Sequence, residues 1–273
     1  MSKKELAGLD QRAAAAKATA LGMAGGSLVN INKQMSNVSP LYRWAASQPR
    51  WAGLRNPFDG LFYQKVKGKN ARPPYNADQL TAIIHGLPDD GWLRWVPIIA
   101  LTTGMRTGEV CQLRAQDVRQ DNGGWLIHVV HDPAQGIATK TKVSRFVPVS
   151  MLLERLGFLN FVSRREGRLF PELERDQTGE YSKASRWFRD HLEEIGVKDG
   201  RDGLGLHSFR HTMADRLRVE AELLDSEVAV ILGHSSTGVT AGYGAISQGS
   251  VNRLRGWIDA VRFDGVDFGK ALA

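Results

Sequence analysis

Two basic residues in the middle of the sequence occupy positions from which they could hold an anion. Arg106 follows Gly104 and immediately precedes a segment with helical periodicity, for which Thr107 is the expected cap. A guanidinium presents a planar pair of N–H groups to two phosphate oxygens, and free backbone N–H groups at a helix start add to the attraction. Lys140 ends a predicted strand, where a hairpin can project its amine into a groove. Taken alone, each residue is more simply explained as a solvated surface charge.

A predicted helix carries His207 and Arg210 on one face, because residues three apart are neighbours on a helix. Phe209 is expected to face the core instead. His207 and His211 also have the i, i+4 spacing of a helix-borne metal site, but the glutamate that follows the first histidine in a zinc protease is missing. Metal binding is therefore the weaker of the two interpretations of this segment.

The sequence Leu-Gly-His at residues 232–234 is followed, nine residues after His234, by Tyr243. Gly233 is expected to end a short helix, which places His234 at a tight turn. Tyr243 has a glycine on each side, and flanking glycines loosen the backbone around a side chain. Such a tyrosine fits a nucleophile that must move, although a lone tyrosine is more often a half-buried amphipathic residue.

The order of these residues is more specific than any one of them. An arginine, a lysine, a His-x-x-Arg pair, a Leu-Gly-His sequence and a tyrosine nine residues later together resemble the tyrosine recombinase (phage integrase) family. Residues 112–118 and 146–149 also resemble that family's sequence around its first arginine and its lysine. The resemblance covers residues 73–250 well and residues 33–61 more loosely. It implies an enzyme that cleaves and rejoins DNA without ATP, a metal or another cofactor.

The resemblance gives a role to each residue that would surround the scissile phosphate. Arg106 and Arg210 would clamp the phosphate, and Glu109 matches an acid that steadies the catalytic arginine. Lys140 would protonate the leaving 5′ oxygen. Two arginines oriented before the reaction can stabilise a pentacoordinate transition state without a metal ion.

The remaining roles concern the attack itself. The resemblance implies that His207 serves as acid and base, that His234 donates a hydrogen bond to the phosphate, and that Tyr243 is the nucleophile. A phenol has a pKa of about 10, so its unaided attack on a phosphodiester is slow. The resulting 3′-phosphotyrosyl bond conserves energy, which would allow a different 5′ hydroxyl to attack it and exchange strands.

The elements that must position these residues are mostly helical. Three β-rich runs, at residues 125–130, 136–140 and 145–149, predict a small antiparallel sheet. Helical periodicity and capping residues predict helices over residues 1–26, 28–46, 76–87, 92–102, 150–165, 182–195, 207–220 and 226–232. The expected fold is mainly α with a small three-stranded antiparallel sheet (α+β), in which a tyrosine-recombinase catalytic domain follows a short helical region.

Positive charge is concentrated at the start of the chain. Residues 1–75 hold 12 Lys or Arg and 3 Asp or Glu, a balance of +9, so the rest carries −2 within a total of +7. Basic surfaces gain affinity for DNA by releasing its counterions, which favours double-stranded DNA as the partner over the alternative of a solubilising tail. A charged segment at residues 65–74 that ends in two prolines predicts a linker. We therefore expect a partial core-binding (clamp) region in residues 1–72, about half the usual size, and a catalytic domain in residues 73–273.

The sequence after Tyr243 predicts a tail helix with an apolar stripe. A short terminal helix cannot bury such a stripe alone. The resemblance implies that the tail docks on a neighbouring protomer in a tetramer on DNA, and packing against its own domain is an equally open alternative. The stripe consists of Val251, Leu254, Trp257, Ile258 and Val261.

Composition narrows the class of protein. Apolar residues make up 42% and charged residues 24% of the 273, as in ordinary globular proteins. The single cysteine, Cys111, excludes an intrachain disulfide and a multi-cysteine zinc site. A cytoplasmic, nucleoid-associated protein is expected, since the uncharged stretch near the start is too short to span a membrane. A site-specific recombinase is the leading hypothesis, and the alternatives are a catalytically limited DNA-binding remnant or a type IB topoisomerase-like enzyme.

Overall fold

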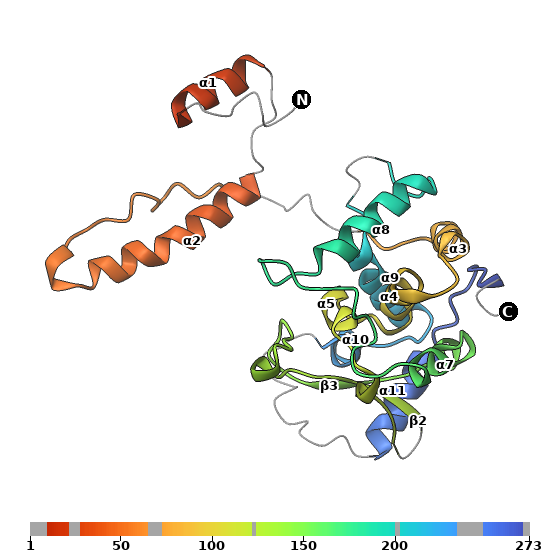
Figure 1. Cartoon of the computed structure of the whole chain (residues 1–273). Helices are drawn as coiled ribbons and strands as arrows, with labels where there is room; N and C mark the ends of the chain where they lie inside the picture. Colours follow the sequence, from red (N-terminus) through yellow and green to blue (C-terminus); the bar gives the residue numbers. More distant parts are fainter. Residues whose placement is uncertain are drawn as a thin grey trace. The chain divides into compact units, whose positions relative to one another are not determined.

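The computed structural model describes residues 10–21, 28–64, 73–121, 124–199, 203–233 and 248–269. The chain divides into two compact units, residues 1–70 and residues 71–273 (Figure 1). None of the helices in these ranges is both long and apolar enough to cross a lipid bilayer.

The first unit is built on one long helix. α1 (Gln11–Ala20) is preceded by Asp10, whose carboxylate accepts a hydrogen bond of 2.8 Å from the Ala13 amide. α2 (Leu28–Ala46) has the predicted bounds, and a 3₁₀ turn, η2 (Pro49–Trp51), follows it. Of the helix predicted over residues 1–26, only α1 is seen, and residues 1–9 and 22–26 lie outside the described residues.

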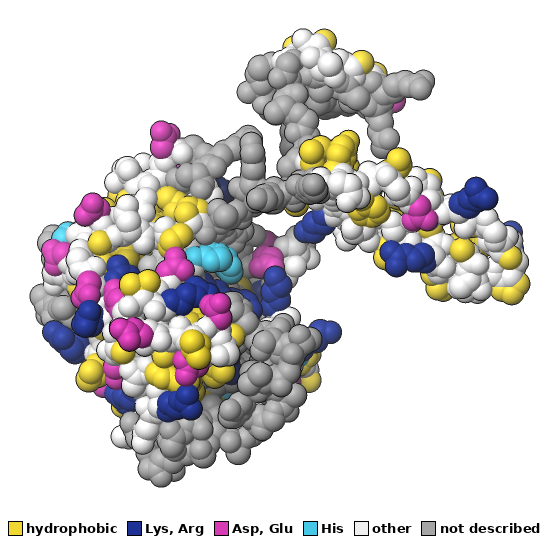
Figure 2. Space-filling view, turned by 180° about the vertical axis from the view of Figure 1, so that it is seen from behind, with side chains coloured by type: hydrophobic (Ala, Val, Ile, Leu, Met, Phe, Trp, Pro, Cys, Tyr) yellow, Lys and Arg dark blue, Asp and Glu magenta, His cyan; other side chains and the backbone are white. Residues whose placement is uncertain are grey.

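The surface of the first unit mixes apolar and basic side chains (Figure 2). Leu41 and Trp44 on α2 are 61% and 57% exposed. Among the described residues of α2, only Met35, Ser39 and Ala45 are buried. The unit therefore has a very small core of its own.

Two helices that lie side by side form the centre of the second unit: α4 (Gly91–Thr103) and α9 (Leu206–Val219) (Figure 1). Every α4 residue from Trp95 to Thr103 is buried. α4 ends, as predicted, before Gly104, whose φ of +64° is a left-handed conformation that favours glycine. A Cβ at Gly104 would overlap the Leu232 side chain, so this glycine also permits close packing.

Local capping signals in the sequence are confirmed at α3 (Ala77–Gly86). The Asn76 side chain accepts a hydrogen bond of 2.8 Å from the Gln79 amide, and the Gln79 side chain accepts one of 3.0 Å from the Asn76 amide. This reciprocal pair satisfies two backbone donors that an uncapped helix would leave free.

The sheet has the predicted size and direction, and two of its three strands are the predicted ones. β1 (Val118–Asp121), β2 (Gly124–Val129) and β3 (Arg145–Pro148) pair antiparallel in the order β1-β2-β3. The prediction of a strand over residues 136–140 is wrong, because that segment makes a single bridge, between Ile137 and Asp132. The Asp132 side chain instead caps a 3₁₀ turn, η4 (Pro133–Gln135), and the chain between β2 and β3 closes into a loop.

Two other expectations about helices are corrected. Thr107 does not cap α5 (Thr107–Cys111): Arg106 occupies the N-cap position, and the helix ends before Leu113. The helix predicted over residues 150–165 is split into α6 (Met151–Arg155) and α7 (Phe158–Ser163) by Gly157, which has a φ of +87°. The other two predicted helices are α8 (Ser182–Glu194) and α10 (Asp225–Leu232).

The tail helix, α11 (Gln248–Asp259), lies against β3 (Figure 1). Leu254, Ile258 and Val261 belong to the core of the second unit, Val251 is 6% exposed, and Trp257 packs against that core. Of the two alternatives that the sequence left open, the structure shows the second for these side chains: the apolar stripe packs against its own domain.

The residues after α11 continue across the second unit to α3. The Asp267 amide donates a hydrogen bond of 3.0 Å to the Thr81 hydroxyl, and the Asp267 carboxylate lies 3.2 Å from His85 Nε2. A Cβ placed on Gly265 would lie 3.3 Å from the Cβ of Ala77, the first residue of α3. The end and the beginning of this unit are thus in direct contact.

Candidate active site

Arg106 is held at the turn between α4 and α5 by a glutamate one helical turn away. Its backbone amide and its Nη1 each donate a hydrogen bond of 3.0 Å to Glu109, one to Oε2 and the other to Oε1. Glu109 is 2% exposed. The position and the direction of the Arg106 side chain are therefore both fixed by one buried carboxylate.

A second arginine, Arg145 at the start of β3, binds the same carboxylate. Its Nη1 and Nη2 donate hydrogen bonds of 3.0 and 2.7 Å to the two oxygens of Glu109. Burial opposes ionisation of Glu109, but the hydrogen bonds and charges of Arg145 and Arg106 outweigh it and lower the pKa of Glu109 to about 2. Sequence reasoning missed Arg145, because nothing in the spacing connects it with a residue 36 positions earlier.

Arg210 on α9 ties together the ends of two other helices. Its Nη1 donates to the Gly104 carbonyl after α4, and its Nη2 donates to the Leu232 carbonyl at the end of α10, both at 2.7 Å. The next carbonyl, that of Gly233, accepts longer hydrogen bonds of 3.4 and 3.5 Å from the Arg106 guanidinium. Both predicted phosphate-binding arginines are therefore brought together at the carboxyl end of α10.

The resulting group, which we call the arginine cluster, consists of Arg106, Arg145, Arg210 and Glu109. Arg210 is 4% exposed. Burial, followed by the positive charges of Arg106 and Arg145, lowers the pKa of Arg210 to about 9, against the opposing effect of Glu109. Three cations around a single carboxylate leave an excess of positive charge in a partly desolvated place, which favours binding of an anion.

The predicted acid–base residue, His207, lies on α9 one turn before Arg210 and is partly buried. Its ring packs edge-on against that of His211, with 5.1 Å between the ring centres. No group of three or more His, Cys, Asp or Glu able to hold a metal ion occurs within the described ranges. Figure 2 shows Lys and Arg side chains gathered beside histidine side chains on one face of the second unit.

Lys140 lies in the loop between β2 and β3, and its side chain is exposed. The loop is held by a hydrogen bond of 3.0 Å from the Thr139 amide to His131 Nδ1 and by one of 3.1 Å from the Lys142 amide to the Thr139 carbonyl. Within the described part of the chain, no hydrogen bond or ion pair joins Lys140 to the arginine cluster.

The other two predicted site residues, His234 and Tyr243, lie outside the described residues. Gly233, however, is described, and it has the left-handed conformation expected of the glycine that ends α10, with a φ of +64°. The segment that carries His234 and Tyr243 therefore begins at the carbonyl that Arg106 contacts.

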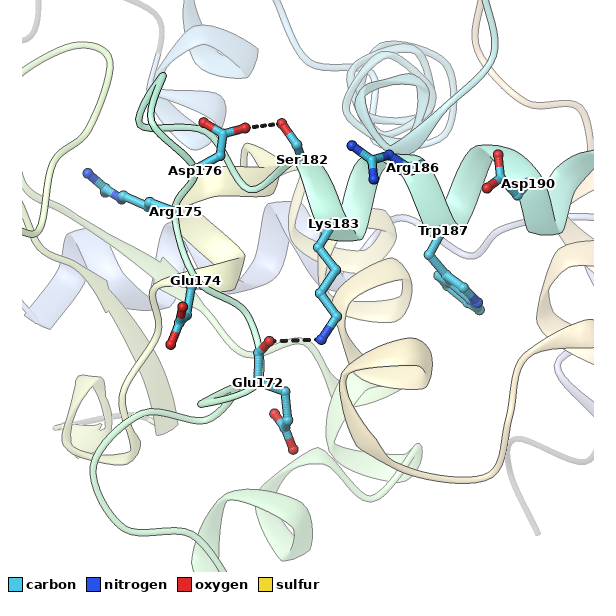
Figure 3. Close-up of a pocket in the computed structure, with 9 residues that line it drawn as sticks. All are labelled: Glu172, Glu174, Arg175, Asp176, Ser182, Lys183, Arg186, Trp187 and Asp190. Carbon is cyan, nitrogen blue, oxygen red and sulfur yellow. Dashed lines mark hydrogen bonds between the residues drawn. The ribbon is translucent and has the colours of Figure 1, made fainter.

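A groove of about 650 Å³ lies elsewhere, between the 172–176 loop and α8 (Figure 3). Acidic and basic side chains alternate around it, and none of the predicted site residues lines it. We therefore place the site at the arginine cluster, where charge and burial coincide, and not in this groove. Its lining consists of Glu172, Glu174, Arg175, Asp176, Ser182, Lys183, Arg186, Trp187 and Asp190.

Comparison with known proteins decides the family. Residues 74–249 match the model of the phage integrase family. The chain belongs to the phage integrase family. Among curated relatives, it is 33% identical to y4rF of Sinorhizobium fredii, which is named as an integrase/recombinase. The match extends over 159 residues, which are 55% of this chain and 34% of y4rF. The chain is 24% identical to the integrase of Escherichia phage P2 over 238 residues, 85% of this chain and 61% of that integrase. The chain thus spans about a third and about three fifths of these two integrase-family proteins.

Solved structures of the family share the fold. A lambda integrase dimer bound to a COC′ core site matches with a TM-score of 0.57 and 20% identity, over 90% of this chain and 84% of that one. The Tn1549 transposon integrase in complex with transposon right-end DNA matches with a TM-score of 0.55 and 18% identity, over 88% and 81%. The mainly helical fold with a small three-stranded antiparallel sheet is that of a tyrosine recombinase catalytic domain, as predicted.

Proposed function

We propose that this protein is a site-specific DNA recombinase that cleaves and rejoins double-stranded DNA through a 3′-phosphotyrosyl intermediate. The observation that carries the proposal is the arginine cluster in a phage integrase chain. Arg106 and Arg210 are anchored on the Leu232 and Gly233 carbonyls and on Glu109, so they are oriented before any substrate arrives. Preorganised cations of this kind stabilise the negative charge of a phosphoryl-transfer transition state.

The remaining steps use groups of the chain itself. The Tyr243 oxygen attacks the phosphorus, and His207 accepts the phenolic proton. The bond from phosphorus to the 5′ oxygen breaks, and Lys140 gives that oxygen a proton, while His234 donates a hydrogen bond to the phosphate. Attack by a 5′ hydroxyl on the phosphotyrosine reverses the sequence and releases Tyr243. Arg, Lys and His side chains stabilise the negative charge on the phosphate and transfer the protons, so the reaction would need no metal ion. The phosphotyrosyl bond conserves the energy of the broken bond, so the reaction would need no ATP.

DNA and further copies of the chain are the proposed partners. The excess of positive charge in the first 75 residues supports contact between the first unit and DNA phosphates, and the chemistry of strand exchange requires several protomers, for which the family suggests four.

A nicked duplex that traps the covalent intermediate tests the proposal. The wild-type protein should form a covalent DNA adduct on a duplex carrying its attachment site, also in the presence of EDTA, because no step requires a divalent ion. Tyr243→Phe should bind the same duplex without forming an adduct, since only the attacking oxygen is lost. Binding without an adduct by the wild-type protein would indicate a DNA-binding remnant instead. Relaxation of a supercoiled plasmid that lacks the site would indicate a topoisomerase.

A further inference from the structure

We infer that Arg145 is a positioning residue for DNA cleavage: it keeps Glu109 ionised and in place, and Glu109 in turn holds Arg106 toward the phosphate. The inference rests on the proposed function. Arg145 would not touch the DNA, and its effect on the reaction would pass through the Glu109 carboxylate and through the backbone at Gly233.

The hydrogen bonds of Glu109 are divided evenly between the two arginines. Oε1 accepts from Nη1 of Arg106 and from Nη1 of Arg145, and Oε2 accepts from the Arg106 amide and from Nη2 of Arg145. The Glu109 carboxylate thus binds the two-pronged guanidinium of Arg145 on one side and Arg106, the residue that it positions, on the other. Without Arg145, Glu109 could rotate away from the Arg106 guanidinium.

Arg145 also supports the second contact of Arg106. A Cβ on Gly233 would lie 2.7 Å from both Cδ and Nε of Arg145, so the stem of this arginine packs directly on the Gly233 backbone. The Gly233 carbonyl accepts hydrogen bonds from Arg106. Arg145 therefore touches both groups, Glu109 and Gly233, that hold the Arg106 guanidinium.

The charges around Glu109 show why an arginine is needed at residue 145. Among the described residues, the charged groups that face this carboxylate are Arg106 at the start of α5, Arg145 on β3 and Arg210 on α9. Burial alone raises the pKa of Glu109, and the hydrogen bonds and charge of Arg145 are the largest opposing effect. Removing Arg145 therefore raises the pKa of Glu109 from about 2, and as the pH falls through the raised pKa, Arg106 loses its charged acceptor.

The test compares Arg145→Met with the wild-type protein in the nicked-duplex assay, at saturating protein and from pH 5 to pH 8. The rate of adduct formation should fall ~100-fold, as for the displacement of a positioned catalytic group. The ratio of variant to wild-type rate should fall further toward pH 5. Placing Glu109→Gln in both proteins should abolish that pH dependence of the ratio, because no carboxylate is left to titrate.

Two further variants separate positioning from a general loss of structure. Arg145→Lys keeps the positive charge but not the two-pronged contact. Its rate should therefore lie between those of the wild-type protein and Arg145→Met, and the ratio of its rate to the wild-type rate should not vary with pH. The exposed Arg119 on β1 offers a matched control, and Arg119→Met should cleave at the wild-type rate.

The outcomes distinguish this inference from the proposed function. If the wild-type protein forms no adduct, the proposed function fails and the positioning role fails with it. Suppose instead that the wild-type protein forms the adduct. If Arg145→Met or Arg145→Lys then cleaves at the wild-type rate at every pH, the positioning role alone is overturned. A folded Arg145→Met protein with a uniform loss of rate at every pH would also overturn it, because Glu109 would then remain ionised without Arg145.

Discussion

The two carboxylate oxygens of Glu109 accept four hydrogen bonds from Arg106 and Arg145, while 2% of the residue is exposed. A buried carboxylate in such a setting cannot be exchanged for a neutral group without leaving cations unpaired. Removing one partner of a buried ion pair costs far more than the net value of the pair, because the remaining charge stays desolvated. At the residue scale, Glu109 therefore serves stability as well as the proposed chemistry.

Glu109→Gln should lower the free energy of unfolding by about 3–5 kcal/mol at pH 7, since the guanidinium groups of the arginine cluster lose the carboxylate that they share. Urea denaturation measures the change. Glu166→Gln is the matched control, because Glu166 is exposed, and it should change the free energy by less than about 0.5 kcal/mol. Equal effects of the two variants would contradict the role of Glu109.

The same variant predicts a dependence on pH. The pKa of Glu109 in the folded protein, about 2, lies below its ordinary value of 4.5, so its contribution to stability is complete above pH 4.5 and is lost as the pH falls toward 2. The difference in unfolding free energy between the wild-type protein and Glu109→Gln should therefore be constant from pH 8 to pH 5 and shrink in more acidic solution. A difference that already shrinks between pH 8 and pH 6 would contradict the lowered pKa.

At the scale of elements, the site is assembled where two helices end. α4 and α10 both stop at a glycine with a φ of +64°, Gly104 and Gly233. Arg210 donates one hydrogen bond to a carbonyl at each of these helix ends. The two glycines have a second function, since a side chain at Gly104 would meet Leu232 and one at Gly233 would meet Arg145. The absence of a Cβ at Gly104 lets the end of α4 approach Leu232 of α10, and its absence at Gly233 makes room for Arg145.

Gly104→Ala should lower the free energy of unfolding by about 1–3 kcal/mol more than Gly91→Ala, because overpacking adds to the cost of a left-handed backbone. Gly91 is the matched control: its φ is +76°, and a Cβ there would meet nothing within 4 Å. Guanidinium chloride denaturation of both variants measures the difference. Equal losses would show that the Leu232 side chain can move aside without cost.

The features that sequence reasoning recovered at this scale are local ones. Asn76 as a helix cap, Gly104 as a helix end and the bounds of α2 follow from residues within a few positions of one another. The motif order was also sufficient for the family and the fold. The grouping of Arg106 with Arg210 is seen in the structure, whereas the catalytic roles of Arg106, Lys140, His207, Arg210, His234 and Tyr243 remain predictions.

What the sequence could not provide depends on contacts between distant segments. Arg145 reaches Glu109 across 36 residues, and no periodicity encodes that ion pair. β1 was missed and a strand over residues 136–140 was wrongly expected, because apolar alternation does not reveal which run finds a partner and which closes into a loop. The sequence pattern of the apolar stripe on α11 is likewise the same whether the stripe packs against its own domain or against another chain.

At the scale of the whole molecule, positive charge is concentrated in and just after the first unit. The first 75 residues carry +9 and the rest −2. Among the described residues of the first unit, Lys and Arg are spread over α1, α2, η2 and the segment after it and do not gather on one helix, which is typical of contacts to phosphate and not to bases. Most of the salt-dependent affinity for DNA should therefore reside in the first unit.

Removal of residues 1–72 should weaken binding to every DNA sequence and flatten the slope of log affinity against log salt by several units, because each phosphate contact contributes about −0.9 to that slope. Discrimination between target and non-target DNA should fall less than total affinity. Titration of the full-length and shortened proteins on both DNAs, at several salt concentrations, measures both quantities. An unchanged slope would show that the basic segment does not touch DNA.

The contact of residues 265–269 with α3 has a consequence for the order in which the protein is made. α3 leaves the ribosome near the start of the second unit, but the residues that contact Thr81, His85 and Ala77 follow much later, with Asp267 186 residues after Thr81. Nearly all of the second unit must therefore be synthesised before α3 can complete its packing. Contacts that span so much of a chain slow folding, because a long loop must be closed before they form. Ribosomes stalled before residue 265 should accordingly display an α3 that remains open to proteolysis.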